Sequence, residues 1–214
     1  MSGWAVTAER GDAAAFHAAE PLARRSANFF AADRPTLVLG SAQPDTDVDP
    51  GVAHALGVEV VRRRSGGGAV LLLPGEFVWL DLVIPSGDPL WLDDVGKAMV
   101  WVGDLWQRTL AELGVVSTVH HGGLVTTDWS RSVCFAGVGT GEVIADDAKL
   151  VGISQRRTRG YARFQSMCHL RWRPEWVAAL ISQPAPTAAA IAGRARAVAV
   201  DAESVMAALV SRLP

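Results

Sequence analysis

The segment that decides the fold is Arg62-Arg63-Arg64-Ser65-Gly66-Gly67-Gly68-Ala69-Val70. Three successive glycines allow a backbone to approach a ligand closely, and the neighbouring guanidinium groups can pair with a carboxylate or a phosphate. The segment differs from the dinucleotide-binding fingerprint because its glycines are contiguous, and from the phosphate-binding loop because no Lys-Ser or Lys-Thr pair follows them. It therefore predicts a corner that binds an anion, and the alternative is a flexible turn flanked by solvated arginines.

Strand patterns surround this corner on both sides. Residues 36–40 and 57–62 precede it, and residues 41–50 between them read as a loop because they contain three Asp and two Pro. Residues 69–73 and 76–84 follow the corner, and the Pro-Gly pair that separates them predicts a hairpin turn.

The rest of the chain alternates between helical and extended patterns. From Asp94 to Leu113 apolar residues recur at steps of three and four, so this segment predicts a helix that stops at Gly114. Further helices are predicted for residues 12–31, with Pro21 as a possible break, 174–181 and 201–213, further strands for 116–120, 142–145, 149–155 and 161–170, and a linker for 184–199. Because several strands are adjacent in sequence, we expect an α/β (α+β) fold, a mixed, largely antiparallel central sheet flanked by helices.

The composition excludes several classes of protein. The 214 residues carry 20 Lys and Arg against 22 Asp and Glu, a net charge of -2, and 50% of them are hydrophobic. We therefore expect one domain over residues 1–214 and no nucleic-acid partner. No apolar run approaches the roughly 20 residues that span a bilayer, so we expect no membrane partner. The two cysteines form no CxxC pair, and the adjacent His120 and His121 face opposite sides of a strand, so we expect a cytoplasmic protein without a metal site.

A second informative segment is Lys149-Leu150-Val151-Gly152-Ile153-Ser154-Gln155-Arg156-Arg157. Ordinary alternation along a strand places Lys149 on the same face as Val151 and Ile153. Burying an unpaired ammonium costs several kcal/mol, so Lys149 is expected either at a pocket mouth that faces a carboxylate or phosphate, or in solvent beyond the strand end. The anion-binding corner favours the pocket.

Together, the two segments resemble the lipoate-protein ligases and octanoyltransferases of the biotin/lipoate protein ligase superfamily. Residues 37–43 (Leu-Val-Leu-Gly-Ser-Ala-Gln) are similar to the family's strand ending in Gly-x-x-Gln, and Cys134-Phe135 precedes the lysine as in many members. The resemblance covers residues 36–165 and implies a biotin/lipoyl ligase-like fold. Many stand-alone ligases of the family carry a C-terminal accessory domain, whereas only 44 residues follow Leu170, so we expect no separate one here.

The resemblance also implies a site and a reaction. Lys149 is the implied catalytic residue, and the residues implied to bind the substrate are Arg63, Ser65, Gly66, Gly67, Gly68, Ala69, Gly152 and Ser154. The implied reaction attaches lipoyl or octanoyl, through an acyl-adenylate, to a lysine of a lipoyl carrier domain. ATP and Mg²⁺ would be co-substrates, lipoate or octanoate the acyl donor, and no cofactor would be tightly bound. The implied partners are the lipoyl domains of 2-oxoacid dehydrogenases, the H protein of glycine cleavage and acyl carrier protein.

Three features leave alternatives open. Cys134 is a second catalytic candidate, because octanoyltransferases of the superfamily use a cysteine thioester; otherwise it is a small buried side chain. Leu71-Leu72-Leu73-Pro74 and Ser166-Met167 stand where the family commonly has His-Asp and His-Gly, which is compatible with a non-catalytic module that binds the acyl group or acyl-adenylate. A cluster of arginines is either a solvated face or a docking surface for an acidic carrier domain, and it contains Arg156, Arg157, Arg159 and Arg163.

Overall fold

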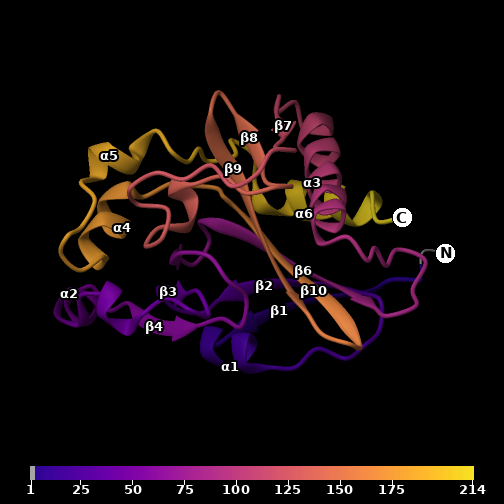
Figure 1. Ribbon diagram of the computed structural model, residues 1–214, viewed down its shortest axis with the longest axis horizontal. Helices are drawn as coiled ribbons and strands as arrows, with labels where there is room; N and C mark the ends of the chain where they lie inside the picture. Colours follow the sequence, from indigo (N-terminus) through magenta and orange to yellow (C-terminus); the bar gives the residue numbers. More distant parts are fainter. Residues whose placement is uncertain (1–2) are drawn as a thin grey trace.

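A seven-stranded sheet forms the centre of the structure, a computed structural model that describes residues 3–214 (Figure 1). In sheet order its strands are β1 (Ala5–Gly11), β2 (Ser26–Ala32), β6 (Phe77–Pro85), β10 (Tyr161–His169), β9 (Ala148–Arg157), β8 (Val143–Ala145) and β7 (Thr118–Val119). β1 runs parallel to β2 after a crossover through α1 (Ala13–Ala18), whereas the neighbouring pairs from β2 to β7 are antiparallel. The predicted mixed, largely antiparallel sheet is confirmed.

A second, three-stranded sheet contains β4 (Glu59–Arg62), β3 (Thr36–Leu39) and β5 (Val70–Leu72) in that order. The predicted hairpin is wrong, because β5 pairs with β3 whereas β6 pairs with β2 and β10. The chain does turn at Gly75, where φ is 78°, but there it passes from one sheet to the other. β6 is buried along nearly its whole length, and the backbone of such a strand needs a pairing neighbour on each edge.

Two helices cover one face of the large sheet. α3 (Val95–Glu112) confirms the prediction from apolar periodicity, and it begins at Asp94, whose Oδ1 accepts a hydrogen bond from Lys97 N–H at 2.9 Å. α6 (Ala202–Ser211) packs against both α3 and β6. Within residues 3–214, no helix combines the length and the apolar character that crossing a membrane requires.

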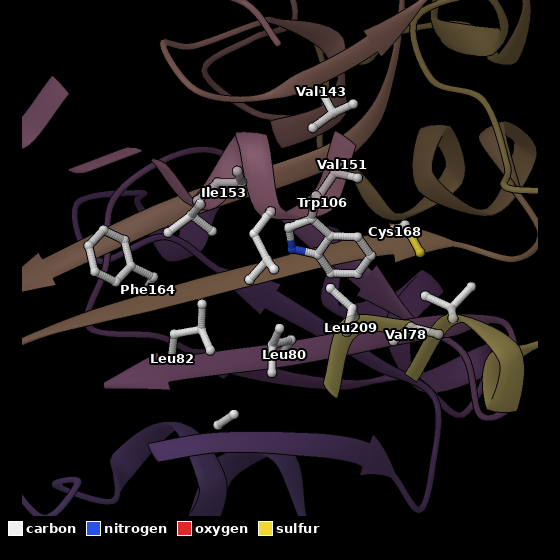
Figure 2. Packing of buried hydrophobic residues seen from close by; sticks show 14 of the residues in the cluster. Val78, Leu80, Leu82, Trp106, Val143, Val151, Ile153, Phe164, Cys168 and Leu209 are labelled. Atoms are coloured by element: carbon white, nitrogen blue, oxygen red, sulfur yellow. The ribbon is translucent and has the colours of Figure 1, made fainter. Parts of the chain in front are cut away.

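The largest cluster of buried apolar side chains lies between these helices and the sheet. Figure 2 shows Trp106 of α3 and Leu209 of α6 close to Leu80 of β6. Trp106 is fully buried, and its Nε1 donates to Ser166 Oγ on β10 at 2.9 Å. An indole without that acceptor would leave a donor unpaired in the core, so the hydrogen bond fixes α3 on the sheet.

The small sheet packs on the opposite face of the large sheet. One cluster of buried side chains joins Phe30 and Trp79 of the large sheet to Val38 and Leu72 of the small one. A further cluster joins the small sheet to α2 (Pro50–Ala55), α4 (Pro174–Leu180) and α5 (Ala188–Ala192). Figure 1 shows these three short helices at one end of the molecule and the pair α3 and α6 at the other.

The predicted helix over residues 12–31 is only partly correct. α1 occupies the beginning of this segment, but its last residues form β2, whose Phe29 and Phe30 pack on opposite faces of the sheet. The helix propensity of the alanines is outweighed because β2 is paired on both edges and half-buried. The sequence does not predict β1, because most of its side chains are exposed and show no apolar alternation.

The predicted loop at 41–50 and linker at 184–199 contain more structure than expected. α2 begins at the end of that loop, with Asp49 as its N-cap. Beyond α5, Lys149 N–H donates to Arg194 O at 2.9 Å, and Arg196 N–H donates to Lys149 O at 3.0 Å. The second segment is therefore a helix followed by a short extension of the large sheet, directly beside Lys149.

Candidate functional site

The triple glycine lies in a loop between β4 and β5, here called the glycine loop (residues 65–69). Its backbone comes closer to its neighbours than side chains would allow. A Cβ on Gly40, at the end of β3, would lie 1.8 Å from the Gly67 carbonyl oxygen, and a Cβ on Gly68 would lie 2.8 Å from Cys134 N. Gly67 also has φ of 99°, a conformation that residues with a Cβ rarely adopt. Glycine is therefore required at these positions.

Arg63 supports the glycine loop from beneath. Its Nη2 donates to the carbonyl oxygens of Gly66 at 2.7 Å and Gly68 at 2.9 Å, and its Nη1 donates to Val38 O at 3.2 Å. Only 2% of Arg63 is exposed, and burial lowers the pKa of its guanidinium from the ordinary value. This predicted substrate-binding residue lies behind the loop, outside the cavity described below, and it holds the loop in shape.

Lys149 of β9 is buried and paired. Its Nζ lies 2.7 Å from Glu142 Oε2 and donates to Cys134 O at 2.7 Å. Nζ also lies 5.3 Å from the centre of the Phe135 ring. The backbone of Lys149 is held by β8 on one edge and by residues 194–196 on the other. The expected carboxylate partner of the ammonium is thus supplied by the protein itself.

Glu142, which the sequence patterns did not indicate as a site residue, is fixed by the backbone. Its Oε2 accepts a hydrogen bond from Gly139 N–H at 2.7 Å, and its Oε1 accepts one from Ile153 N–H at 3.1 Å. Glu142 is 4% exposed, so it forms a buried ion pair with Lys149. The available signal was the need of a buried lysine for a counter-ion, and Glu142 stands directly before β8, the neighbour of β9.

Residues 132–134 pair with the end of the glycine loop and bring Cys134 to it. Ala69 N–H donates to Ser132 O at 2.9 Å, and Cys134 N–H donates to Ala69 O at 3.0 Å. The thiol of Cys134 is partly buried, and a Cβ on Gly67 would lie 3.7 Å from its Sγ. Cys168, in contrast, is fully buried in β10, and burial raises the pKa of its thiol to about 12.

These segments enclose a cavity of about 400 Å³. Its polar side chains include Ser130, Arg131, Cys134, Glu142, Lys149 and Ser154, and its apolar side chains are Val95, Met99, Leu124 and Ile153. The three glycines of the loop form part of its wall. The structure therefore brings Lys149, Cys134, Ser154 and the triple glycine together around one hollow that has both charged and apolar walls.

Three further predicted site residues lie behind the wall of this cavity. Ala69 is buried in the pairing with residues 132–134. A Cβ on Gly152 would lie 3.2 Å from the Phe135 ring, so this glycine makes room for the ring near Lys149. Ser65, the first residue of the loop, is buried, with its Oγ 2.9 Å from Ser154 Oγ.

The contact between the two serines continues into the core. Ser65 Oγ donates to Gln165 Oε1 at 3.0 Å, and Gln165 Nε2 lies 3.4 Å from His17 Nδ1. Burial lowers the pKa of His17 to about 3, so its imidazole is neutral at physiological pH. This chain of polar groups joins the glycine loop to β9, β10 and α1, and it holds Ser154 at the cavity wall.

The arginines that follow Lys149 are engaged within the chain. Arg156 forms an ion pair with Glu20 at 2.9 Å, the Arg157 guanidinium lies 4.4 Å from the Trp91 ring centre, and Arg163 is buried in an ion pair. Arg163 is therefore no part of a surface, whereas Arg156 and Arg157 are partly exposed and Arg159 is exposed, so a docking surface at these three residues stays a prediction.

The positions at which histidines were expected are occupied by core residues. Leu71 and Leu72 are buried in β5, and Ser166 receives the Trp106 hydrogen bond and donates to Leu80 O at 3.0 Å. Within residues 3–214, no group of three or more His, Cys, Asp or Glu side chains is arranged to hold a metal ion.

Comparisons with known proteins agree with this geometry. Residues 13–205 match the family described as the lipoyl protein ligase A/B catalytic domain. A lipoate-protein ligase A bound with ATP has a TM-score of 0.70 at 18% identity, covering 88% of this chain and 71% of that chain. The bi-partite lipoate protein ligase of Thermoplasma acidophilum has a TM-score of 0.74 at 16% identity, covering 97% and 80%.

A further T. acidophilum protein, solved with bound lipoic acid, has a TM-score of 0.69 at 16% identity, covering 93% of this chain and 75% of that chain. No curated protein sequence matches this one. The structural likeness confirms the predicted lipoate-ligase-like fold.

Proposed function

Because this chain belongs to the family of lipoyl protein ligase A/B catalytic domains and is therefore an enzyme, we propose that it attaches lipoate or octanoate to a lysine of a lipoyl domain through an acyl-adenylate. In this reaction the described residues act as one catalytic domain. The family and the neighbouring ligase structures favour this reaction over a Cys134 thioester transferase and over a non-catalytic binding module.

The observation that carries the proposal is the mixed character of the cavity. The Lys149 ammonium stands at a wall that also contains Arg131, and apolar side chains of Val95, Met99 and Leu124 line the same hollow. Cations suit a carboxyl or phosphoryl group, and apolar walls suit a hydrocarbon tail. A medium-chain acyl group that ends in a carboxylate or an adenylate has both parts.

In the first step, a carboxylate oxygen of lipoate attacks the α-phosphorus of ATP, and pyrophosphate leaves with the electron pair of the broken P–O bond. Both reactants are anionic, so their approach is opposed by charge repulsion unless cations stand beside them. Lys149 and Arg131 supply positive charge at the cavity wall. The glycine loop adds backbone groups at the same wall without side chains that would block the ligand.

In the second step, the ε-amine of the acceptor lysine attacks the acyl carbonyl and an amide bond forms. The nitrogen releases a proton to solvent, and AMP leaves with the electron pair of the broken C–O bond. Negative charge develops on the carbonyl oxygen during the attack. An ammonium held in place before the reaction stabilises that charge without reorganising, which is the role proposed for Lys149.

The apolar walls contribute to the choice of acyl group. Burying an eight-carbon tail at about 0.8 kcal/mol per methylene gives roughly 5 kcal/mol, which is enough to discriminate between chain lengths without many polar contacts. Met99 of α3 lines the cavity together with Leu124 and Ile153.

The titles of neighbouring structures support the substrates and the partner. One ligase binds ATP, a T. acidophilum protein binds lipoic acid, and the bi-partite ligase is described together with its E2 lipoyl domain. We extend this partner class to lipoyl domains of 2-oxoacid dehydrogenases, the H protein of glycine cleavage and acyl carrier protein as an acyl source.

The test is incubation with ATP, Mg²⁺, lipoate or octanoate, and a lipoyl domain, read by the intact mass of the domain. The expected result is a mass increase of one lipoyl or octanoyl group, together with pyrophosphate exchange that depends on the acid. Lys149→Ala is expected to lose both. Transfer from octanoyl-acyl carrier protein without any exchange, and an acyl adduct absent from Cys134→Ser, would instead establish the thioester route.

A further inference from the structure

Two acceptors of the protein stand beside the Lys149 ammonium, a group that carries three N–H donors. Nζ donates to Cys134 O at 2.7 Å and forms an ion pair with Glu142 Oε2, also at 2.7 Å. Cys134 begins the short helix η2 (Cys134–Ala136), which packs against β9, whereas Glu142 precedes β8. The two acceptors therefore fix Nζ from separate segments, at a position where Lys149 also lines the cavity.

Glu142 cannot follow Lys149 if the ammonium moves. Each of its oxygens accepts a backbone N–H, from Gly139 at 2.7 Å and from Ile153 at 3.1 Å. A carboxylate restrained by two backbone amides presents its charge at one fixed point. The position of Nζ is thereby set by the backbone of the sheet rather than by the flexible lysine side chain.

No other carboxylate within residues 3–214 shares this environment. Glu142 carries the one carboxylate on the cavity wall. Asp146 and Asp147, nearer to Lys149 in sequence, are exposed, and Asp146 pairs with Arg196 at 2.7 Å. An ammonium that is 2% exposed depends on a buried counter-charge, and Glu142 alone supplies it.

We propose that Glu142 is the positioning residue of Lys149: its fixed carboxylate holds the ammonium at the cavity wall, where the ammonium faces the carboxyl oxygen of the acyl substrate. Glu142 acts through Lys149 and makes no bond to the substrate, whose carboxylate it would repel. The inference rests on the proposed ligase reaction and adds to it the residue that orients its cation.

Two substitutions separate charge from shape. Glu142→Gln keeps the size of the side chain and an acceptor for Ile153 N–H, but it removes the charge and the acceptor of Gly139 N–H. Glu142→Asp keeps the charge but shortens the side chain by one methylene. In pyrophosphate exchange at saturating ATP, Glu142→Gln is expected to lower kcat about 100-fold, by analogy with the removal of one preorganised transition-state group. The KM for lipoate is expected to change less than about 3-fold because the apolar walls remain intact. Glu142→Asp should lie between Glu142→Gln and the wild type in kcat.

A binding measurement tests whether the effect passes through Lys149. The probe is an acyl-sulfamoyl adenosine, a stable analogue of the acyl-adenylate, titrated by calorimetry. Glu142→Gln alone is expected to weaken its binding by about 10-fold or more, a coupling typical of residues in one charge network. In a Lys149→Met background the same substitution should have no further effect, and that double variant should fold because neither buried charge is left unpaired.

Several outcomes would overturn the inference. Wild-type kcat in Glu142→Gln would do so, including the case in which only its Tm falls, because the pair would then serve stability alone. An equal loss of analogue binding with and without Lys149 would show that Glu142 acts by another route. If Glu142→Gln does not fold, the inference is tested by the kcat of Glu142→Asp against the wild type and by analogue binding of the double variant against Lys149→Met. A wild type that neither catalyses exchange nor binds the analogue would refute the ligase proposal itself, and the inference with it.

Discussion

Buried ionisable side chains of this fold avoid the cost of burial in three different ways. Lys149 and Arg163 lie 2.7 Å and 2.5 Å from carboxylate oxygens, and Arg63 donates to peptide carbonyls. His17 and His169 stay neutral because burial lowers the pKa of each to about 3. The cations therefore depend on acceptors placed by neighbouring strands, whereas the histidines make the stability of the fold depend on pH.

The substitution His169→Phe measures how much His169 contributes to the pH dependence of the free energy of unfolding. The native state binds no proton at His169 until the pH approaches 3, whereas the unfolded chain binds one near pH 6.5, so the stability is complete above pH 6.5 and falls below it. Between pH 7 and pH 5 this proton contributes a loss of about 2 kcal/mol. Phenylalanine can keep the contacts of the ring with Phe135 and Trp172, at 4.5 and 5.0 Å between centroids.

We expect urea unfolding to show a loss about 2 kcal/mol larger in the wild type than in His169→Phe over that pH range. Parallel losses in the two proteins would mean that His169 binds its proton in the folded state.

A second prediction concerns Arg63 and the shape of its guanidinium. Lysine cannot reproduce the fork that donates to Val38, Gly66 and Gly68, so Arg63→Lys leaves at least one buried carbonyl unpaired. The expected cost is about 1–3 kcal/mol in the free energy of unfolding, with weaker binding of the acyl-adenylate analogue. Arg34→Lys is the matched control, since the Arg34 side chain is 56% exposed. A change no larger than that of the control would contradict the supporting role of Arg63.

At the scale of elements, the close approach of β3 to the glycine loop has a direct test in Gly40→Ala. The added Cβ would lie 1.8 Å from the Gly67 carbonyl oxygen, so the loop or the strand must move. We expect a loss of about 2 kcal/mol or more by thermal unfolding, as for other strained or overpacked sites. Gly66→Ala is the control for stability, because nothing lies within 4 Å of its Cβ position. Equal unfolding free energies for the two variants would show that this contact is not tight.

The elements that could be predicted are those whose own sequence contains the whole signal. The periodicity of α3 reflects one face packed on the sheet, and β9 and β10 are long apolar or alternating segments. β1 and β2 could not be recognised, because the alanines of β2 favour a helix in isolation and β1 is mostly exposed. Their parallel pairing depends on tertiary contacts, which the sequence of neither strand shows by itself.

The same distinction applies to the site. The triple glycine, Lys149 and Cys134 stand in recognisable local motifs, and the structure brings them to one cavity. Glu142 and Arg131 have no motif of their own, since they reach the cavity only through the pairing of β8 with β9 and of residues 132–134 with the glycine loop. Contacts between distant segments are invisible to patterns read along the chain.

At the scale of the molecule, the cavity is formed by both sheets and by α3. β9 contributes Lys149, the connection from β4 to β5 contributes the glycines, and α3 contributes Val95 and Met99. A ligand that bridges these parts should stabilise the whole fold rather than one element.

The corresponding prediction is a rise in Tm with lipoate and a non-hydrolysable ATP analogue together. At a ligand concentration 100 times its Kd, the stabilisation is about 2.7 kcal/mol, or roughly 5–10 °C for a chain of this size. Lys149→Ala should show a much smaller rise under the same conditions. An identical rise in both proteins would place ligand binding away from Lys149.

The two thiols differ in exposure, so their rates of alkylation report on the opening of the whole fold. Cys168 has no exposed surface in β10 and its pKa is raised to about 12, whereas Cys134 borders the cavity. Because only a thiolate is alkylated at an appreciable rate, an iodoacetamide reagent should add one label to the intact molecule and a second only when the sheet opens. The rate at which the second label is added would then give the rate of spontaneous opening of the sheet under native conditions, without denaturant or an attached fluorophore.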